Sequence, residues 1–204
     1  MKLSFKIKYK IFKRIADILF SIIILALLSP ALLIIVFIIL ITSKGLIFFN
    51  HPRLGENGKL FKCIKFRTMY EGSQEKLAEI LNENKELQKE FETNFKLRKD
   101  PRITPFGKFL RKTSIDELPQ FLNVIKGEMS IIGPRPIVPH EKDRYQSDLN
   151  LLLSVKPGIT GLWQVKGRSK TTYGTRKDLD LSYVRKFGLK LDLKIFFKTF
   201  YVLL

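Results

Sequence analysis

The longest hydrophobic pattern in the chain is an apolar run, residues 18–41, that contains no charged side chain. As a straight helix this run would be roughly 36 Å long, enough to cross the hydrocarbon core of a bilayer. A secretory signal peptide has a shorter apolar core followed by a small-residue cleavage site, which this run lacks. A domain of this size could hardly enclose a helix that is apolar on every face. The run therefore predicts insertion into a membrane.

A proline interrupts this run near its middle, at Ser29–Pro30. Proline removes a backbone hydrogen bond and clashes with the preceding turn, so it kinks or breaks a helix. A kinked spanning helix and a re-entrant hairpin both fit the proline. Basic flanks prefer the cytoplasmic side, and both flanks are basic here, which favours the hairpin with residues 1–44 as the membrane element. The flanking cations are Lys2, Lys6, Lys8, Lys10, Lys13 and Arg14 before the run and Lys44, Arg53, Lys59, Lys62, Lys65 and Arg67 after it.

The rest of the chain, residues 45–204, has the polar pattern of one folded domain. Residues 47–69 place two apolar-rich runs around the turn-forming GENG, which predicts a strand hairpin. Residues 74–98 carry one apolar stripe among many charges and predict a helix. A short helix is expected after Thr104, where Pro105 suits the first turn.

Two further helices are predicted in the second half of the chain. Ser114 followed by Glu117 matches a capping box, so a helix is expected from Ile115 to Lys126, before Gly127. Residues 189–204 set apolar side chains among lysines and predict an amphipathic helix, which lies either in a membrane interface or in the core. The fold class predicted from these patterns is a mixed α/β type that is mostly helical.

Composition adds a strong positive charge to this picture. The 204 residues include 37 Lys and Arg against 19 Asp and Glu, a formal net charge of +18, which suits anionic partners such as nucleic acid, an anionic membrane or phosphorylated substrates. The length fits one domain. Cys63 is the only cysteine, which excludes an intrachain disulfide and a cysteine-cluster metal site. Two histidines, His51 and His140, make a histidine-rich metal site a poor interpretation.

Two adjacent acids stand out in so basic a chain, Asp116 and Glu117. Helix capping is the simplest interpretation of such a pair. However, Arg111 and Lys112 lie just upstream, and Arg135 is fixed between two prolines. Acids among cations at a helix N-terminus are typical of a site that holds phosphate together with Mg²⁺. An ionised aspartate in such a site can also attack phosphorus.

Several strings in one order resemble a known family. They are the Ser29–Pro30 run, KFRTM (65–69), DEL (116–118), LNVIKGEMSIIGPRP (122–136), KPGITGLWQVKGR (156–168) and LDLK (191–194). Together they identify the chain as similar to the bacterial sugar transferases of the small monotopic phosphoglycosyl transferase class. The resemblance covers nearly the whole chain.

This resemblance implies a reaction and roles for single residues. It implies transfer of a phosphosugar from a UDP-sugar to undecaprenyl (polyprenyl) phosphate, with release of UMP, as the initiating step of polysaccharide or glycoconjugate synthesis. Asp116 would be the nucleophile of a covalent intermediate, and Glu117 the ligand of a Mg²⁺ cofactor. The substrate-binding residues it implies are Lys65, Arg111, Arg135 and Asp192, with Arg168 and Asp180 as further candidates.

The resemblance also implies where the protein works. It implies a re-entrant membrane helix broken at Ser29–Pro30 and a small cytoplasmic catalytic domain, residues 45–204, with amphipathic interfacial helices. The expected location is the cytoplasmic face of the bacterial inner membrane, with membrane lipids as partners and no nucleic acid. A homodimer is compatible with it. The alternatives are a non-enzymatic, membrane-tethered binder of nucleic acid or anionic lipid, and an enzyme that transfers the phosphosugar directly, without a covalent intermediate.

Overall fold

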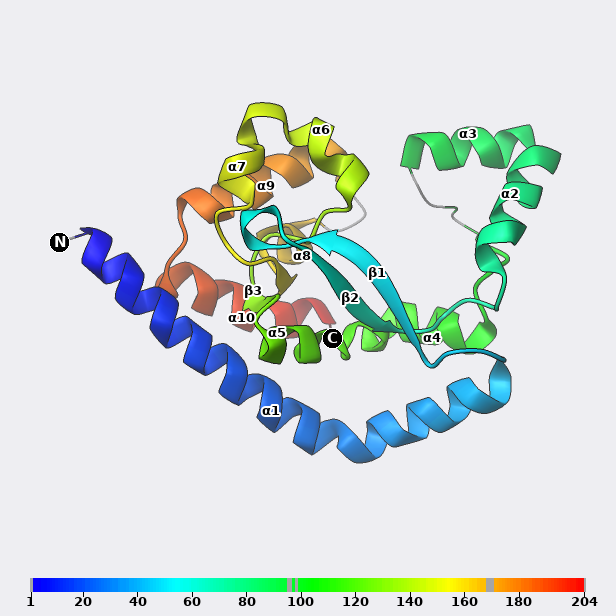
Figure 1. Cartoon of the computed structure of the whole chain (residues 1–204), viewed down its shortest axis with the longest axis horizontal. Coiled ribbons are helices and arrows are strands. Elements are labelled where there is room, and N and C mark those ends of the chain that lie inside the picture. The colour runs from blue at the N-terminus through cyan, green and yellow to red at the C-terminus, as the bar shows by residue number, and fades with distance from the viewer. Residues whose placement is uncertain (1, 95–96, 98, 168–170, 204) are drawn as a thin grey trace. The chain divides into compact units, whose positions relative to one another are not determined.

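A computed structural model of the chain describes residues 2–94, 97, 99–167 and 171–203. The described residues are mostly helical, with two short two-stranded sheets (Figure 1). The chain divides into two compact units. The first unit comprises Met1–Ser29, Asn50–Lys65 and Pro119–Leu204, and the second comprises Pro30–Phe49 and Phe66–Leu118.

The apolar N-terminal segment forms one helix, α1 (Lys2–Thr42), with Pro30 inside it. The predicted break at Ser29–Pro30 is therefore wrong for the secondary structure, because the helix continues through it. The reason is local: Pro30 has no N–H for the carbonyl of Ala26, and the hydroxyl of Ser29 donates to that carbonyl instead, at 2.8 Å. The membrane topology of α1 stays a prediction.

Helix α1 has the surface that membrane association requires. Within the described residues, it is the one helix long and apolar enough to cross a membrane, over Lys8–Thr42, and only 6% of its most apolar window is buried. A core helix of a soluble protein would be mostly buried instead. The large exposed side chains are Ile11, Phe12, Ile15, Leu19, Ile22, Ile23, Leu27, Leu33, Ile34, Phe37, Leu40 and Ile41.

The predicted hairpin is confirmed as a two-stranded sheet of β1 (Phe48–Leu54) and β2 (Leu60–Phe66). A short 3-10 turn, Glu56–Gly58, joins the strands, and Asn57 takes the left-handed conformation with φ 58°. Asparagine tolerates that conformation better than most residues, which suits it to the turn.

The first unit is built around a second, parallel strand pair. Strand β3 (Ser130–Ile132) pairs with β4 (Gly158–Thr160), with Ser130 opposite Gly158 and Ile132 opposite Thr160. A core of Ile132, Val155, Leu162, Val165, Tyr183, Val184 and Ile195 surrounds the pair. The helices of this unit besides α1 are α5 (Gln120–Lys126), α6 (Lys142–Tyr145), α7 (Leu149–Leu152), α8 (Leu162–Lys166), α9 (Tyr173–Arg185) and α10 (Leu189–Leu203).

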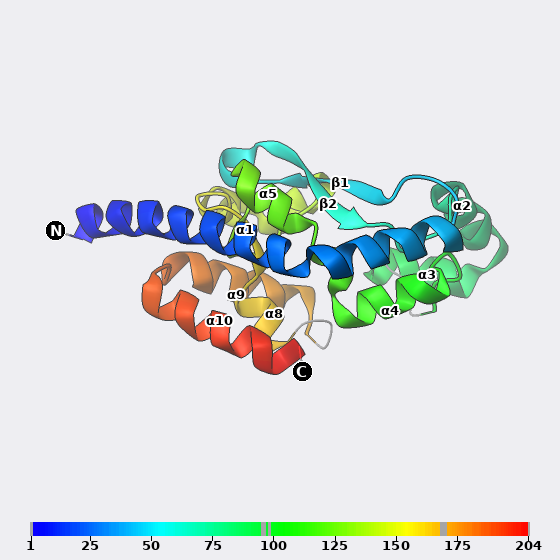
Figure 2. The same ribbon diagram turned by 90° about the horizontal axis from the view of Figure 1, so that it is seen from below.

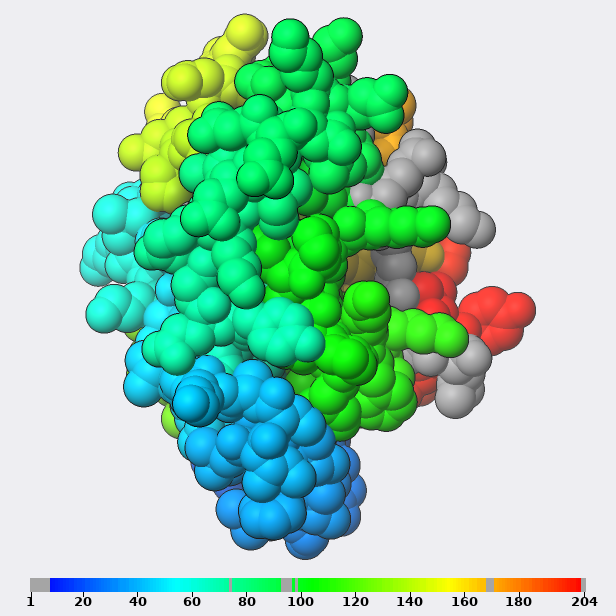
Figure 3. Space-filling view, turned by 90° about the vertical axis from the view of Figure 1, so that its right-hand side faces the viewer, coloured from blue at the N-terminus to red at the C-terminus, as the bar shows by residue number. Residues whose placement is uncertain are grey.

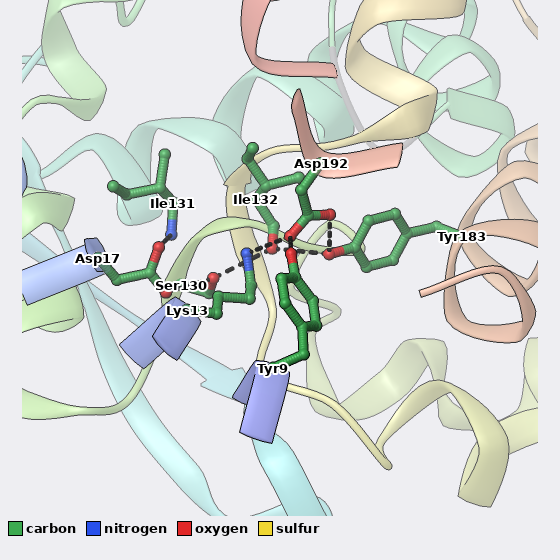
Figure 4. A network of polar contacts seen from close by, with 8 residues as sticks. All are labelled: Tyr9, Lys13, Asp17, Ser130, Ile131, Ile132, Tyr183 and Asp192. Carbon is green, nitrogen blue, oxygen red and sulfur yellow. Dashed lines mark hydrogen bonds and ion pairs between the residues drawn. The ribbon is translucent and has the colours of Figure 1, made fainter. Parts of the chain in front are cut away.

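Helix α10 lies next to the first half of α1 (Figure 2). Its Asp192 ties that half of α1 to the rest of this unit. Its Oδ2 accepts hydrogen bonds from the Tyr9 hydroxyl and from Nζ of Lys13, both at 2.6 Å, and its Oδ1 accepts one from the Tyr183 hydroxyl at 2.8 Å (Figure 4). Burial and the carboxylate of Asp192 raise the pKa of Tyr183, so its hydroxyl stays a donor. Lys13, which the sequence placed in a basic flank, thus forms a partly buried ion pair with Asp192.

Two more contacts fasten the same half of α1. The carboxylate of Asp17 accepts from the hydroxyl of Ser130 at 2.7 Å and from the backbone N–H of Ile131 at 3.3 Å, at the start of β3 (Figure 4). Arg14 donates to the carbonyls of Val124 and Ile125 at the end of α5. Since these bonds satisfy carbonyls that a helix end leaves free, they stabilise both helices.

Helix α10 confirms the predicted amphipathic helix and has one core-facing side and one exposed apolar side. Ile195 is 1% exposed and belongs to the core, whereas Phe197 and Tyr201 are 68% and 81% exposed. One face therefore packs inside the unit, and the other presents large apolar side chains next to Lys194 and Lys198, which are also exposed. This arrangement suits a membrane interface as well as a core.

The second unit has its own small core of Ile39, Phe66 and Leu110. Helix α4 (Pro105–Thr113) confirms the helix predicted after Thr104, because the Thr104 side chain accepts from the N–H of Gly107 and Pro105 takes the first turn. The long helix predicted over 74–98 is wrong. It is instead a pair, α2 (Ser73–Glu83) and α3 (Lys85–Asn94), whose teal and green side chains are on the surface in Figure 3.

Asn84 divides that pair. Its backbone is extended, and its side-chain Oδ1 accepts from the N–H groups of Glu86 and Leu87 at 3.0 and 3.1 Å. An asparagine that bonds the backbone two and three residues ahead starts a new helix. The apolar stripe continued through this position, so periodicity alone did not reveal the break.

Candidate active site

Asp116 and Glu117 lie at a sharp corner after α4, in a 3-10 turn, Ile115–Glu117. The corner begins at Ser114, whose backbone is left-handed at φ 59° and whose N–H donates to the carbonyl of Arg111 at 3.3 Å. Asp116 is buried and Glu117 is half-buried. The two acids are thus fixed by backbone geometry at the end of one helix.

The predicted helix from Ile115 to Lys126 and its capping box are wrong. A capping box needs the N–H of Ser114 to bond the side chain of Glu117, but α4 already uses that N–H. The turn ends at Glu117, and α5 starts only at Gln120, after Pro119. The simplest non-functional explanation of the Asp–Glu pair therefore does not apply.

Arg111 belongs to the same corner. Its Nε donates to the hydroxyl of Thr68 at 2.8 Å, and the charge of Asp116 acts on its guanidinium. Thr68 is held in turn, because its carbonyl accepts from the N–H of Thr104 at 3.0 Å. At Gly107 a Cβ would lie 2.1 Å from that carbonyl, so only glycine lets α4 approach so closely. The predicted residues Arg111, Asp116 and Glu117 are brought together within the second unit.

The carboxylates at this corner fit only one mode of Mg²⁺ binding, in which the substrate supplies part of the ligands. No group of three or more His, Cys, Asp and Glu side chains that could hold a metal ion occurs among the residues the structure describes. An all-protein cage is therefore absent from that part of the chain. Mg²⁺ usually binds one or two carboxylates together with substrate phosphates and water, and Glu117 beside Asp116 supplies such a partial set.

A cluster of cations occupies the first unit. Lys65, Arg53, Arg135 and His140 all act electrostatically on His51. Burial, with those cations, lowers the pKa of His51 to about 4, so its ring is neutral near pH 7. The predicted residues Lys65 and Arg135 therefore share one neighbourhood, which suits an anionic ligand.

Arg53 of β1 orders one side of this cluster. Its Nη1 donates to the carbonyl of Pro136 at 3.0 Å, and its Nη2 lies 3.2 Å from Nδ1 of His51. Because the ring is neutral, Nδ1 can accept this bond. Arg53 thus fixes the Pro-Arg-Pro loop from the strand side.

A close approach of two glycine-containing loops fixes Arg135 from the other side. The N–H of Gly158 donates to the carbonyl of Pro134 at 2.9 Å, and a Cβ at Gly133 would lie 2.5 Å from the carbonyl of Lys156. The loop before Arg135 and the loop before β4 therefore pack backbone to backbone. The segment that places Arg135 between two prolines is thus held by β1 on one side and by the loop before β4 on the other.

Asp180 of α9 lies under this loop and is fully buried. Its Oδ1 accepts from the backbone N–H of Arg135 at 3.4 Å, and its Oδ2 lies 3.7 Å from Nε of Arg176. Arg176 also donates to Glu141 at 3.0 Å. Burial raises the pKa of Asp180 to about 7, against the lowering effect of Arg176 and Arg135.

This pKa predicts how Asp180 affects stability with pH. A carboxyl whose pKa is higher in the folded than in the unfolded chain holds its proton more tightly when folded, so stability falls as pH rises from about 4 to 7. Asparagine mimics the neutral acid and lacks this dependence. We therefore compare the midpoints of thermal unfolding of Asp180→Asn and the natural protein. The variant's midpoint minus the natural protein's midpoint should increase between pH 5 and 7 and level off above pH 8.

The facing groups that enter this prediction are Arg176, Arg135, Glu141 and Tyr145. The exposed Asp178→Asn on the same helix is the matched control for the loss of one carboxylate from α9. Parallel curves for Asp180→Asn and the natural protein would contradict the expectation.

One predicted substrate-binding residue is placed differently, and another lies outside the described residues. Asp192 is 5% exposed, and both of its carboxylate oxygens are engaged by Tyr9, Lys13 and Tyr183, so its described contacts hold α1. Arg168 lies outside the described residues. The substrate contacts of both stay predictions.

Sequence reasoning missed Arg53, Trp163 and Arg176. His51 and Arg53 alternate on a strand, so their side chains share one face of it, which was an available signal. Arg176 and Asp180 are four residues apart on α9, another available signal. Trp163 had no local signal for a contact with Arg135.

Comparison with known proteins agrees with the resemblance in the motifs. The family model for bacterial sugar transferases matches residues 8–204. A protein of Haemophilus influenzae named as an uncharacterized sugar transferase is 47% identical over 199 residues, which are 98% of this chain and 42% of that protein. The exopolysaccharide production protein ExoY of Sinorhizobium fredii is 47% identical over 187 residues, 92% of this chain and 83% of that protein.

A third relative has a name that states its activity. The undecaprenyl-phosphate galactose phosphotransferase of Salmonella typhimurium is 49% identical over 192 residues, 94% of this chain and 40% of that protein. The chain thus spans about two fifths of the Haemophilus and Salmonella proteins and most of ExoY. With the family model matched over nearly all its length, the chain belongs to the bacterial sugar transferase family.

Proposed function

We propose that the protein transfers the phosphosugar group of a UDP-sugar to undecaprenyl phosphate and releases UMP, at the cytoplasmic face of the bacterial inner membrane. The name of the Salmonella relative supports the lipid acceptor and makes galactose the first sugar to test. The observation that carries the proposal is the corner after α4, where the buried Asp116 and the half-buried Glu117 adjoin Arg111. Helix α1 supplies the membrane association that a polyprenol substrate needs.

Asp116 would divide the transfer into two displacements at the same phosphorus. In the first, a carboxylate oxygen of Asp116 forms a bond to the phosphorus that bears the sugar, and the bond from that phosphorus to the bridging oxygen breaks, so UMP leaves with the electron pair. In the second, a phosphate oxygen of undecaprenyl phosphate attacks the same phosphorus and the bond to Asp116 breaks. The products are undecaprenyl diphosphate sugar and the restored carboxylate.

The cations of the chain would bind and orient the phosphates. Arg111, held by Thr68, lies close enough to Asp116 to neutralise charge on the phosphoryl oxygens during attack. Lys65 and Arg135, in the cluster around His51, would bind the diphosphate of the donor. Fixed donors stabilise developing charge more than mobile ones, because they need no reorganisation at the moment of reaction.

Glu117 would hold Mg²⁺ together with the diphosphate oxygens, in line with the partial donor set at the corner. When bound, the ion would neutralise phosphate charge and favour the departure of UMP. Glu117 would help to orient the ion, because the turn sets its carboxylate one residue from Asp116.

The proposal predicts UMP release in a defined assay. Purified protein in detergent, with undecaprenyl phosphate and Mg²⁺, should release UMP from at least one donor in a panel of UDP-galactose, UDP-glucose and their N-acetylated forms. The released UMP should equal the lipid-linked sugar formed, because each transfer yields one of each. Product is measured by extraction of lipid carrying a radiolabelled sugar.

The assay also separates the proposal from a binding protein. A membrane-tethered binder of nucleic acid or anionic lipid would release no UMP from any donor, although it would retain both ligands. That result across the whole panel would overturn the proposed function.

A further inference from the structure

Arginine and aromatic side chains alternate in the first unit, in the order Arg135, Trp163, Arg176, Tyr173 and Arg144. The guanidinium carbons of Arg135 and Arg176 lie 5.5 and 5.3 Å from the centre of the Trp163 ring. Those of Arg176 and Arg144 lie 5.1 and 4.4 Å from the centre of the Tyr173 ring. All four distances are within the range in which a cation is attracted to an aromatic face. We call this set the arginine–aromatic ladder.

The Trp163 ring is fixed in place. Its Nε1 donates to the hydroxyl of Thr171 at 2.8 Å, and the neighbouring Leu162 is buried. Gly161 caps the N-terminus of α8, which carries Trp163, and a Cβ at Gly161 would lie only 2.0 Å from the carbonyl oxygen of Gly133. The segment that carries Trp163 therefore contacts the backbone just before Arg135, and neither can shift alone.

The two arginines at this ring differ in their other partners. Arg176 forms an ion pair with Glu141 at 3.0 Å and lies near Asp180. The guanidinium of Arg135 has no ion pair with any residue that the structure describes. Arg135 is thus oriented by an aromatic face, which leaves its N–H donors for a ligand. A carboxylate in the position of the ring would also have oriented the guanidinium, but it would have accepted hydrogen bonds from the N–H groups that a ligand needs.

We propose that Trp163 is a positioning residue, whose ring orients the guanidinium of Arg135 toward the diphosphate of the donor. The inference rests on the proposed function, in which Arg135 contacts phosphate. Arg176, which is paired with Glu141, contacts the same ring, so the ring lies among charged groups that are themselves held in place. The single tryptophan of the chain therefore acts through Arg135 and not on the substrate itself.

A double-mutant cycle tests the inference. Trp163→Leu removes the aromatic face, and we expect kcat/KM for the UDP-sugar to fall about tenfold. Trp163→Phe keeps a ring and should recover most of that loss. In an Arg135→Gln background, Trp163→Leu should cost no more than about twofold, because nothing remains for the ring to orient. The exposed Lys142→Gln controls for loss of a nearby cation and should leave kcat/KM unchanged.

The possible failures are distinct. If Trp163→Leu costs the same factor with Arg135 present or absent, the tryptophan acts by packing alone and the inference is wrong. If Arg135→Gln itself has no effect while UMP release continues, the phosphate contact assigned to Arg135 is wrong. If no donor yields UMP, the proposed function is wrong.

A second measurement uses the natural chain, in case the leucine variant does not fold. Because the protein has one tryptophan, its fluorescence reports on Trp163 alone. UDP with Mg²⁺ should change the emission of the natural protein, since the negative charge of the ligand beside the guanidinium of Arg135 changes the electrostatic field at the ring. The change should be absent in Arg135→Gln. An equal change in both proteins would show that the ring senses the ligand without Arg135 and would contradict the inference.

Discussion

Asp116→Asn is expected to reduce steady-state UMP release by about a thousandfold or more, because loss of a nucleophile removes the covalent route altogether. Asparagine has nearly the same shape, so the 3-10 turn at Ile115–Glu117 should persist. The midpoint of thermal unfolding should stay within a few degrees of the natural value. The exposed Asp143→Asn is the matched control and should retain full activity.

The covalent step itself is observable without the lipid. Natural protein mixed with Mg²⁺ and the UDP-sugar should release one equivalent of UMP in a burst, and mass analysis should find a phosphosugar on the peptide that contains Asp116. With both substrates present, ping-pong kinetics are expected. If there is neither an adduct nor a burst, while turnover begins as soon as undecaprenyl phosphate is added, then the transfer is direct and Asp116 has another role.

The parts of the fold that could be predicted from sequence are those decided by neighbouring residues. The hairpin over 47–69 and the start of α4 at Thr104 follow from turn and capping chemistry within a few positions. The predicted helix over 115–126 was wrong although the sequence matches a capping box, because the preceding helix already uses the N–H of Ser114. A local motif cannot show which of two helices takes a shared donor.

In the candidate site, too, associations between residues close in sequence could be predicted, whereas those made by distant parts of the chain could not. Arg111, Asp116 and Glu117 are close in sequence, so their association at one corner could be expected. The ring beneath Arg135 could not, since Trp163 is brought there by the contact of Gly161 with Gly133. Asp192 shows the reverse problem, because its motif predicted a substrate contact and its described partners are Tyr9, Lys13 and Tyr183.

Glu117→Gln tests the predicted metal ligand. Glutamine keeps the size of the side chain but loses the charge that a divalent ion needs, so we expect turnover at low millimolar Mg²⁺ to fall about a hundredfold. Because the defect would lie in binding of the ion, the difference in turnover between Glu117→Gln and the natural protein should decrease as the Mg²⁺ concentration is raised. The variant should also need a higher Mg²⁺ concentration for its half-maximal rate. Chelation with EDTA should abolish UMP release by the natural protein, and added Mg²⁺ should restore it.

The Mg²⁺ dependence separates a ligand from a residue that only stabilises the turn. A structural role for Glu117 would lower the midpoint of thermal unfolding and scale the rate equally at every Mg²⁺ concentration. The exposed Glu79→Gln of α2 is the control for loss of one acid in this unit, and its Mg²⁺ dependence should equal that of the natural protein. Since α4 already takes the N–H that a capping role would need, we expect Glu117→Gln to shift the Mg²⁺ curve and to leave the unfolding midpoint nearly unchanged. A near-normal rate at low Mg²⁺ would remove Glu117 from the metal site.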